Sequence, residues 1–297
     1  MNKKNHRLIF FGNERLATGT SSKLAVFLGL IKSGYDVGAV VLNQATIHAR
    51  NNRDPEIVTV ANRYKIPILK PRSTADMRTE LLPYDAQVGV LVAFGKPIPQ
   101  TLIDIFPGGI INLHPSLLPQ YRGPTPVEQA LLDGQRQTGV SIMRLEQKMD
   151  AGSIFTQAKV DIPTLTSKQE LANSLDGVGA KLLIENLPAI LSGELKPRPQ
   201  NDGLVTYTKL IDKSSGLIDW SKPAVQLERE VRAFQGWPKS RAKVRGHEII
   251  ITAARVAKDT EDGDLVMKCS PGWLEILELT APSGRTMSGA DFLRGYT

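Results

Sequence analysis

Short apolar runs alternate with segments of helical periodicity over the first two thirds of the chain. The apolar runs have the length and continuity of strands that are buried on both faces. Strands are expected at 7–11, 37–42, 88–94, 109–113, 139–145 and 154–162, and helices at 22–33, from 54 onward, at 99–105, 125–133 and 167–191. This alternation predicts an α/β fold with a doubly wound, mostly parallel sheet that carries helices on both faces.

Three of the expected helices begin with recognisable local signals. Ser21 stands where the N-cap of the first helix is expected. Asp54 precedes Pro55, so the aspartate is expected to cap the second helix with the proline at its first position. Ser167 and Glu170 have the spacing of a capping box, which predicts the start of the long helix that ends near residue 191.

The pattern changes near residue 192. Residues 192–203 are polar and rich in proline and glycine, which is typical of a linker between domains. Beyond them we expect one helix, at 223–234, and short strands separated by glycine turns, at 241–245, 248–256, 264–268 and 273–279. We therefore predict a first domain over 1–191, a linker over 192–205 and a small OB-like β-barrel domain over 206–297.

Composition limits the class of protein. The chain has 297 residues, 41% of them hydrophobic and 23% charged, as in ordinary soluble proteins. One cysteine and four histidines provide no disulfide framework and too few ligands for a zinc site, so no metal is expected. The sequence has no signal-peptide pattern and no apolar run of membrane-spanning length, which favours a cytoplasmic protein outside the membrane. A net charge of +7 permits an anionic partner such as RNA.

Two polar side chains stand at the end of the apolar strand 109–113. Asn112 and His114 are two residues apart, so on a strand they share a face. Asp150 lies in a turn between two strands that we expect in the same sheet, and at the same sheet edge it would reach His114. A carboxylate orients an imidazole, and an amide can donate to a developing oxyanion. The three would suit attack on a carbonyl by a nucleophile from outside the protein, although from spacing alone residues in such positions more often have purely structural roles.

Cations recur at every second position near the start of the second domain. They are Lys239, Arg241, Lys243 and Arg245, and on a strand they would share one face while the residues between them point to the core. Such a row is either a solvated strand face or a stripe that follows phosphates, as in OB-type domains.

Two sequence signatures resemble those of the 10-formyltetrahydrofolate-dependent formyltransferases. The first is Asn112-x-His114-x-Ser116-Leu117-Leu118-Pro119, followed by Arg122-Gly123, and the second is Thr138–Met143 followed by Met149–Gly152. The resemblance continues past the linker in 204–207, 218–220, 227–234 and 237–238, which are similar to the methionyl-tRNA formyltransferase branch of that family.

The resemblance implies an activity and a set of site residues. The formyl group of 10-formyltetrahydrofolate would be transferred to the α-amine of methionine on initiator tRNA, for translation initiation, by a protein expected to be a monomer. Catalytic roles would belong to Asn112, His114 and Asp150. Folate would lie against Ala93, Phe94, Gly95 and Lys96 and against Ser116, Leu117, Leu118 and Pro119. The tRNA would contact Arg50, Arg53, Lys239, Arg241, Lys243 and Arg245.

The chain departs from the family pattern at two loops. The family follows its first strand with Gly-Thr-Pro-x-Phe, whereas this chain has Gly12-Asn13-Glu14-Arg15-Leu16, and the loop 43–54 has no lysine run. The first of these segments also lacks the glycine pattern of dinucleotide-binding folds. Two other functions remain open: formyl transfer to a small amine such as an amino sugar, and RNA binding without catalysis.

Overall fold

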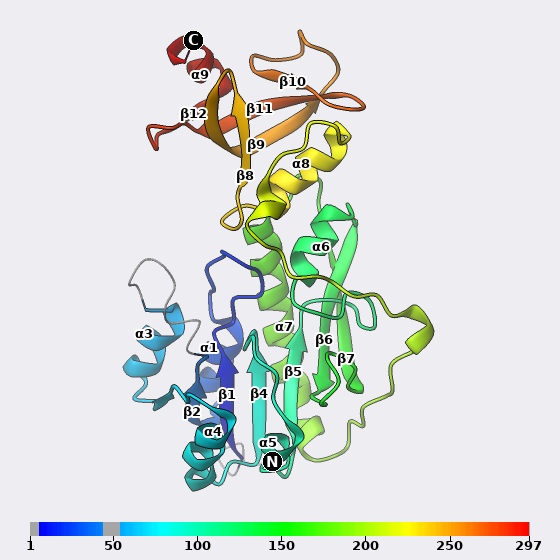
Figure 1. Ribbon diagram of the computed structural model, residues 1–297. Helices are drawn as coiled ribbons and strands as arrows, with labels where there is room; N and C mark the ends of the chain where they lie inside the picture. Colours follow the sequence, from blue (N-terminus) through cyan, green and yellow to red (C-terminus); the bar gives the residue numbers. More distant parts are fainter. Residues whose placement is uncertain (1–5, 44–53, 297) are drawn as a thin grey trace.

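The structure is a computed structural model that describes residues 6–43 and 54–296 (Figure 1). In this part of the chain, seven strands form a first sheet in the order β3-β2-β1-β4-β5-β6-β7. They are β1 (Arg7–Gly12), β2 (Asp36–Val41), β3 (Ile68–Leu69), β4 (Val88–Val92), β5 (Ile110–His114), β6 (Gln137–Arg144) and β7 (Ile154–Asp161). The first five strands in sequence run parallel, and β6 is antiparallel to both β5 and β7. The predicted doubly wound, mostly parallel sheet is confirmed.

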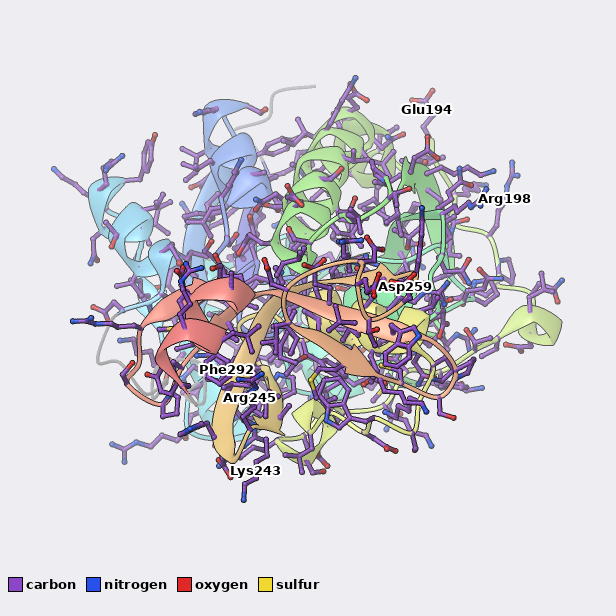
Figure 2. The ribbon with its side chains drawn as sticks, turned by 90° about the horizontal axis from the view of Figure 1, so that it is seen from above. Glu194, Arg198, Lys243, Arg245, Asp259 and Phe292 are labelled. Carbon is purple, nitrogen blue, oxygen red and sulfur yellow. The ribbon has the colours of Figure 1, made fainter. Side chains whose placement is uncertain are left out.

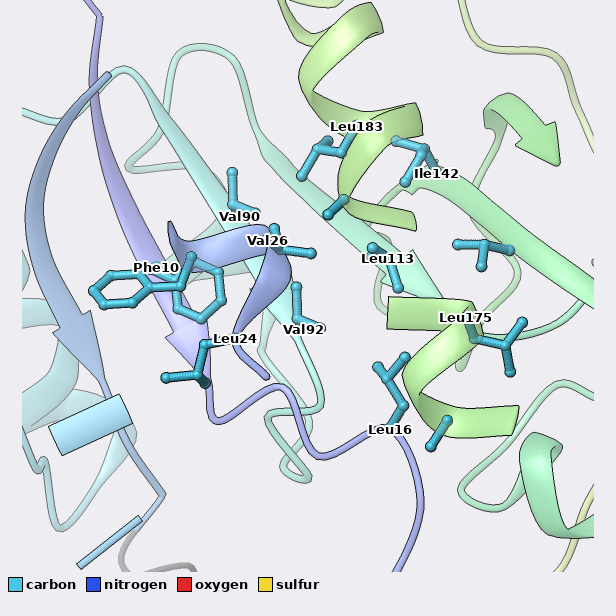
Figure 3. Packing of buried hydrophobic residues seen from close by; sticks show 14 of the residues in the cluster. Phe10, Leu16, Leu24, Val26, Val90, Val92, Leu113, Ile142, Leu175 and Leu183 are labelled. Atoms are coloured by element: carbon cyan, nitrogen blue, oxygen red, sulfur yellow. The ribbon is translucent and has the colours of Figure 1, made fainter. Parts of the chain in front are cut away.

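Helices cover both faces of the first sheet. They are α1 (Ala25–Lys32), α3 (Glu56–Arg63), α4 (Thr74–Leu81), α5 (Gln100–Ile103), α6 (Pro126–Leu132) and α7 (Lys168–Leu191), with a 3-10 turn, η2, at Leu82–Tyr84. Buried side chains of α1, α3, α6 and α7 form one apolar cluster with the sheet, part of which is shown in Figure 3. Buried side chains of α4 and α5 form a second cluster on the opposite face. The sheet is therefore buried on both sides, as its continuous apolar strands require.

Two predicted helix starts are wrong. Helix α1 begins at Ala25 rather than at Ser22, and its N-terminal N–H groups are bonded to the distant carboxylates of Glu14 and Asp176 instead of Ser21. Pro55 precedes α3 and does not occupy its first position, and Asp54 does not cap it. The capping box at the start of α7 is present as predicted. Caps supplied across the fold carry no local sequence signal, because the accepting carboxylates are far from the helix in the chain.

A second, antiparallel sheet forms from the C-terminal part of the chain. Its order is β10-β11-β9-β8, with β12 pairing with β11. The elements are α8 (Ala224–Ala233), β8 (Ser240–Val244), β9 (His247–Ala257), β10 (Val266–Lys268), β11 (Trp273–Thr280), β12 (Thr286–Ser288) and α9 (Gly289–Gly295). The curled sheet is consistent with the predicted OB-like domain, and β12 and α9 were not predicted. Figure 1 shows α8 between this sheet and the ends of α6 and α7.

Residues 198–208, which we call the strap, belong mostly to the predicted linker. They lie in the segment that connects α7 to α8 outside β6 and β7 (Figure 1). The backbone of Arg198 pairs with Ile154 at the start of β7, and Tyr207 pairs with Arg122. The 3-10 turns η3 (Asp202–Leu204) and η4 (Ser214–Gly216) interrupt the segment. The predicted boundaries at 191 and 206 stay predictions, but the strap is bonded to the first sheet and its loops along its length.

Candidate active site

Asn112 and His114 lie on one face of β5, near its carboxyl end. Ile111 precedes Asn112, and Leu113 lies between Asn112 and His114. Both apolar side chains point to the other face of the sheet, into the cluster that includes α7. Both polar residues are only 5% exposed. The alternation predicted from sequence is therefore present, and it brings an amide and an imidazole to the sheet edge where ligands bind in open α/β folds.

The His114 ring lies between two oxygen acceptors. Its Nε2 is 2.9 Å from the backbone oxygen of Tyr121, and its Nδ1 is 3.7 Å from Oδ1 of Asp150. In the imidazolium form both ring nitrogens would point a hydrogen toward an oxygen. The distance to Asp150 is longer than a hydrogen bond, so the two side chains face each other without being locked together.

Asp150 is held mainly through contacts other than the imidazole. Its Oδ2 accepts a 2.7 Å hydrogen bond from the backbone N–H of Gly123. Its backbone is left-handed, with φ of 48°, in the turn between β6 and β7. Gly152 in the same turn approaches β6 so closely that a Cβ there would lie 1.8 Å from the carbonyl oxygen of Arg144. The structure thus brings Asp150 to His114, as predicted, by means of a tight turn.

The Asn112 amide has no hydrogen-bond partner among the side chains and backbone groups that the structure describes. Its amide atoms are not among the fully buried side-chain atoms without a partner, so they keep some exposure to the space beside β5. Its donors are available to an oxygen of a bound substrate. The arrangement supplies a donor, an imidazole and a carboxylate but no serine or cysteine nucleophile.

The segment Ser116–Pro119 is hydrogen-bonded to β6 and β7. The Leu118 N–H donates to Oγ of Ser141, whose hydroxyl donates to the Ser116 carbonyl at 2.6 Å. Gln157 donates to the Leu118 carbonyl and to the same hydroxyl. Leu117 packs over Gly139, where a Cβ would lie 2.4 Å from its side chain. The Leu118 N–H and the carbonyls of Ser116 and Leu118 thus have partners within the protein, and a folate contact of this segment stays a prediction.

Ala93, Phe94 and Gly95 line a pocket of about 350 Å³ at the carboxyl ends of β1 and β4. Strand order reverses between these two strands, which is where α/β sheets open a ligand crevice. Gly95 and its exposed neighbour Lys96 make no backbone–backbone hydrogen bond within residues 6–43 and 54–296. Pro124 also lines the pocket and follows the glycine that binds Asp150. A larger pocket, of about 670 Å³, lies between β7 and residues 194–199, and none of the three predicted catalytic side chains lines either pocket.

The unusual loop after β1 forms another wall of the 350 Å³ pocket. Asn13 accepts a hydrogen bond from the backbone of Arg15, and the Arg15 guanidinium is 2.9 Å from Glu56 at the start of α3. Glu14, with φ of 55°, turns into the core and accepts hydrogen bonds from Val26 and Phe27. The residues that depart from the family pattern are thus well anchored and keep Arg15 at the pocket.

Two carboxyl groups meet beneath this loop. Burial, and secondarily the charge of Asp176, raise the pKa of Glu14 well above its usual value. Burial raises the pKa of Asp176 to about 6, against the opposing hydrogen bond from Ala25. These carboxyls lie at the N-terminus of α1, where negative charge is favoured. They support the loop and are not part of the predicted catalytic set.

The four cations near β8 do not form the predicted single row. Lys239 and Arg245 lie outside the strand and have left-handed backbones, with φ of 72° and 48°. Arg241 is half-buried and donates to the Lys213 carbonyl, so it packs against the segment before α8. Lys243 is exposed, and Figure 2 shows it near Arg245 at the edge of the second sheet. A tRNA-binding role for these residues stays a prediction, and Arg50 and Arg53 lie outside the described residues.

Arg122, Ser141 and Gln200 are the residues that sequence reasoning did not assign to the site. Arg122 and Ser141 lie within the quoted signatures, which was the available signal, whereas Gln200 lies in the presumed linker. Within residues 6–43 and 54–296, no group of three or more His, Cys, Asp or Glu side chains could hold a metal ion. No helix in the described ranges is both long and apolar enough to cross a membrane.

Comparison with known families defines the class of protein. Residues 15–187 match the formyl transferase family, and residues 210–297 match the formyl transferase C-terminal domain. The chain therefore belongs to the formyl transferase family. It is 36% identical over 307 residues to a methionyl-tRNA formyltransferase of Roseiflexus castenholzii, an alignment that covers 97% of this chain and 96% of the relative. A methionyl-tRNA formyltransferase of Chloroflexus aurantiacus is 34% identical over 305 residues, with the same two coverages.

A solved structure shares the fold at low sequence identity. HypX from Aquifex aeolicus, in complex with tetrahydrofolic acid, superimposes with a TM-score of 0.64 and 15% identity. The match covers 98% of this chain and 47% of HypX, so the chain spans about half the length of that protein. At this identity the likeness demonstrates the architecture.

Proposed function

We propose that this protein transfers the formyl group of 10-formyltetrahydrofolate to the α-amine of methionine on initiator tRNA. The observation that carries the proposal is the buried Asn112 amide without a partner, beside His114 and Asp150. This set stabilises charge on a carbonyl oxygen and moves a proton, but it contains no protein nucleophile. The nucleophile must then arrive on a second substrate, as an amine does in formyl transfer.

The folate part of the proposal rests on the pocket between β1 and β4. Its volume, about 350 Å³, is at the small end of the range of ligand sites. Gly95 and Lys96 offer backbone groups free of backbone–backbone bonds in the described chain, which suits a flat, hydrogen-bonding ring. The chemistry supplied by bound 10-formyltetrahydrofolate is a formyl group on a nitrogen that leaves as tetrahydrofolate.

Asn112, His114 and Asp150 would each have a different role in formyl transfer. The Asn112 amide would donate to the formyl oxygen as the methionine amine forms its bond to the formyl carbon. The protonated His114 ring would donate to the same oxygen through Nδ1, which lies 3.7 Å from Asp150 and is not hydrogen-bonded to it. Asp150 would orient the imidazole and take up the proton that the amine releases. As the carbon–nitrogen bond to folate breaks, that proton ends on the leaving nitrogen. Positioned acid–base groups contribute about 10²–10⁴-fold in rate, and a single oxyanion donor about 10²–10³-fold.

The acceptor is proposed from the relatives and from charge. Curated relatives named methionyl-tRNA formyltransferase align over nearly the whole chain, including the C-terminal part. The exposed Lys243 near Arg245 and the net charge of +7 favour a polyanionic partner. We further propose that the protein acts as a monomer in the cytoplasm, where charged tRNA is made, and light scattering of the purified protein tests its mass.

A panel of acceptors tests the proposal against its alternatives. Purified protein with 10-formyltetrahydrofolate would receive methionyl initiator tRNA, the same tRNA without methionine, or a nucleotide-linked amino sugar. We expect rapid formylation of the methionyl-tRNA alone. Formylation of the amino sugar instead would support the small-amine function, and tRNA binding without any transfer would support a non-catalytic role.

A further inference from the structure

The strap makes a direct connection to the turn that carries Asp150. The Gln200 side-chain amide nitrogen donates 2.8 Å hydrogen bonds to the carbonyl oxygens of both Asp150 and Gly152. Its amide oxygen accepts from Nε and Nη2 of Arg122, at 3.1 and 2.8 Å. Gln200 therefore joins the turn between β6 and β7 to the residue that precedes Gly123, the donor to the Asp150 carboxylate.

Chemistry leaves only one orientation for the Gln200 amide. A guanidinium donates and never accepts, and a backbone carbonyl accepts and never donates. The amide oxygen must then face Arg122, and the amide nitrogen must face the two carbonyls. Arg122 is 1% exposed, and its remaining contacts are Asp202 at 3.3 Å and the Tyr207 hydroxyl at 3.5 Å. Because a buried guanidinium must be satisfied, it fixes Gln200 in turn.

The strap also contacts the residue that accepts from His114. Oγ1 of Thr206 accepts a 2.8 Å bond from the backbone N–H of Tyr121, and the Tyr121 carbonyl faces Nε2 of His114. The same eleven-residue strap thus contacts the backbone on which both His114 and Asp150 depend. Since the 3.7 Å separation between these two side chains is too long to hold them together, their relative position depends on such outside contacts.

We propose that Gln200, oriented by Arg122, is a positioning residue that holds the Asp150 turn in its catalytic geometry; this rests on the proposed function. Asp150 has a left-handed backbone, which aspartate adopts more readily than most residues with a side chain but which hydrogen bonds to the turn still stabilise. Gln200 supplies two of those hydrogen bonds, and Gly123 supplies a third. The strap is therefore part of the working site rather than a passive connection between two sheets.

Gln200→Glu separates positioning from folding. The carboxylate keeps an acceptor for Arg122, so the buried guanidinium stays paired, but it has no donors for the carbonyls of Asp150 and Gly152. We expect the turn to shift and kcat to fall by about 10- to 100-fold, because displacements near 1 Å cost up to that factor. KM for tRNA and for folate should change by less than about threefold, since neither substrate loses a contact.

Gln200→Met is a second test variant, and Asn201→Ala is the matched control. The methionine variant has a similar length and lacks both the donors and the acceptor, so it should lower kcat similarly and reduce the melting temperature as well. The only hydrogen bond of the Asn201 side chain within the described residues is to Gly203 of the strap, and Asn201→Ala should leave kcat within about twofold of wild type. Rates are divided by the folded fraction measured by circular dichroism.

The experiment distinguishes a failure of the Gln200 role from a failure of the proposed function. A folded Gln200→Glu or Gln200→Met protein with wild-type kcat, or one with a change in KM alone, would overturn the role of Gln200. Wild-type protein that transfers no formyl group to methionyl-tRNA would overturn the proposed function, and the role of Gln200 with it.

Discussion

The carboxyl end of β5 and the strand β8 both carry polar side chains at alternating positions, but they are built in different ways. Around β5, hydrogen bonds from the 116–124 loop position His114 and Asp150, and side chains of the strap bind that loop and the turn between β6 and β7. Along β8, Lys243 is exposed to solvent, and Arg241 packs against its own neighbouring segment.

The proposed site at β5 depends on the exact positions of its side chains, whereas a phosphate-binding surface on β8 would depend mainly on its charge. Positioned acid–base and oxyanion groups lose most of their effect when they move by about 1 Å. Phosphate contacts depend on the number of cations far more than on their exact bonds. Substitutions near β5 should accordingly affect turnover strongly, and substitutions on β8 should change only salt-dependent affinity.

The largest effect is expected at Asn112. Replacing it with alanine removes a donor to the formyl oxygen and should lower kcat by about 10²–10³-fold. Asn112→Asp has nearly the same shape but no N–H, and it should lose at least as much. Steady-state formyl transfer measures both. If Asn112→Ala keeps kcat within about threefold of wild type, the β5 row is structural rather than catalytic.

A second test concerns the acids beneath the loop after β1. The pKa of Asp176 is raised to about 6 in the folded protein from a usual value of 3.8, so the folded state binds more protons between these values. Its contribution to stability is therefore fully present below about pH 4 and is lost as pH rises through about 6. Asp176→Asn should raise the free energy of unfolding at pH 7 by up to about 3 kcal/mol.

Chemical denaturation at several pH values measures that effect. The gain in Asp176→Asn should shrink as pH falls from 7 toward 4. The exposed Asp291 provides a matched control, because its pKa is lowered by Ser288 and Arg294, so Asp291→Asn should give no gain at pH 7. A constant difference between wild type and Asp176→Asn across this range would contradict the argument.

Ser141 tests how far the Ser116–Pro119 segment depends on β6. Its fully buried hydroxyl bonds to Ser116, Leu118 and Gln157. Ser141→Ala should cost about 1–3 kcal/mol of stability because it leaves buried groups without partners. The hydroxyl of the exposed Ser192 makes one bond to its own helix, and Ser192→Ala should cost less than about 0.5 kcal/mol. Equal losses in the two variants would show that the segment does not rely on Ser141.

The smallest effect is expected in the salt dependence of tRNA binding, which should differ between variants of two cations of β8. Lys243→Ala should reduce the slope of log K against log salt for tRNA binding by about 0.7–0.9, the value for one phosphate contact. Arg241→Ala should leave the slope unchanged, because its guanidinium is already engaged with the Lys213 carbonyl. Binding titrations at several salt concentrations measure both slopes. Equal reductions in the two variants would restore the predicted continuous row.

Sequence reasoning succeeded where a signal was local. The alternation of Ile111, Asn112, Leu113 and His114, and the capping box at Ser167, each depend on residues within a few positions of one another. It failed where partners are distant in the chain. Glu14 caps α1 with Asp176 from α7, and Gln200 reaches Asp150 from the presumed linker, and neither arrangement has a periodicity that a pattern could reveal.

Short or weakly amphipathic elements were also missed. Strand β3 has only two residues, and α4 buries only Met77 and Leu81, so neither produces a clear hydrophobic pattern. The row of cations near β8 was wrongly extended, because the left-handed residues at both of its ends interrupt the strand. Alternation in a sequence predicts a shared face only as far as the strand continues.

The most direct test is the rate of a single turnover of formyl transfer to methionyl initiator tRNA, measured with wild-type protein and with His114→Ala. Both proteins are saturated with 10-formyltetrahydrofolate, and folding is verified by circular dichroism. The account predicts rapid transfer by the wild type and a loss of at least about 10²-fold in the variant. Transfer at comparable rates by the two proteins would contradict it.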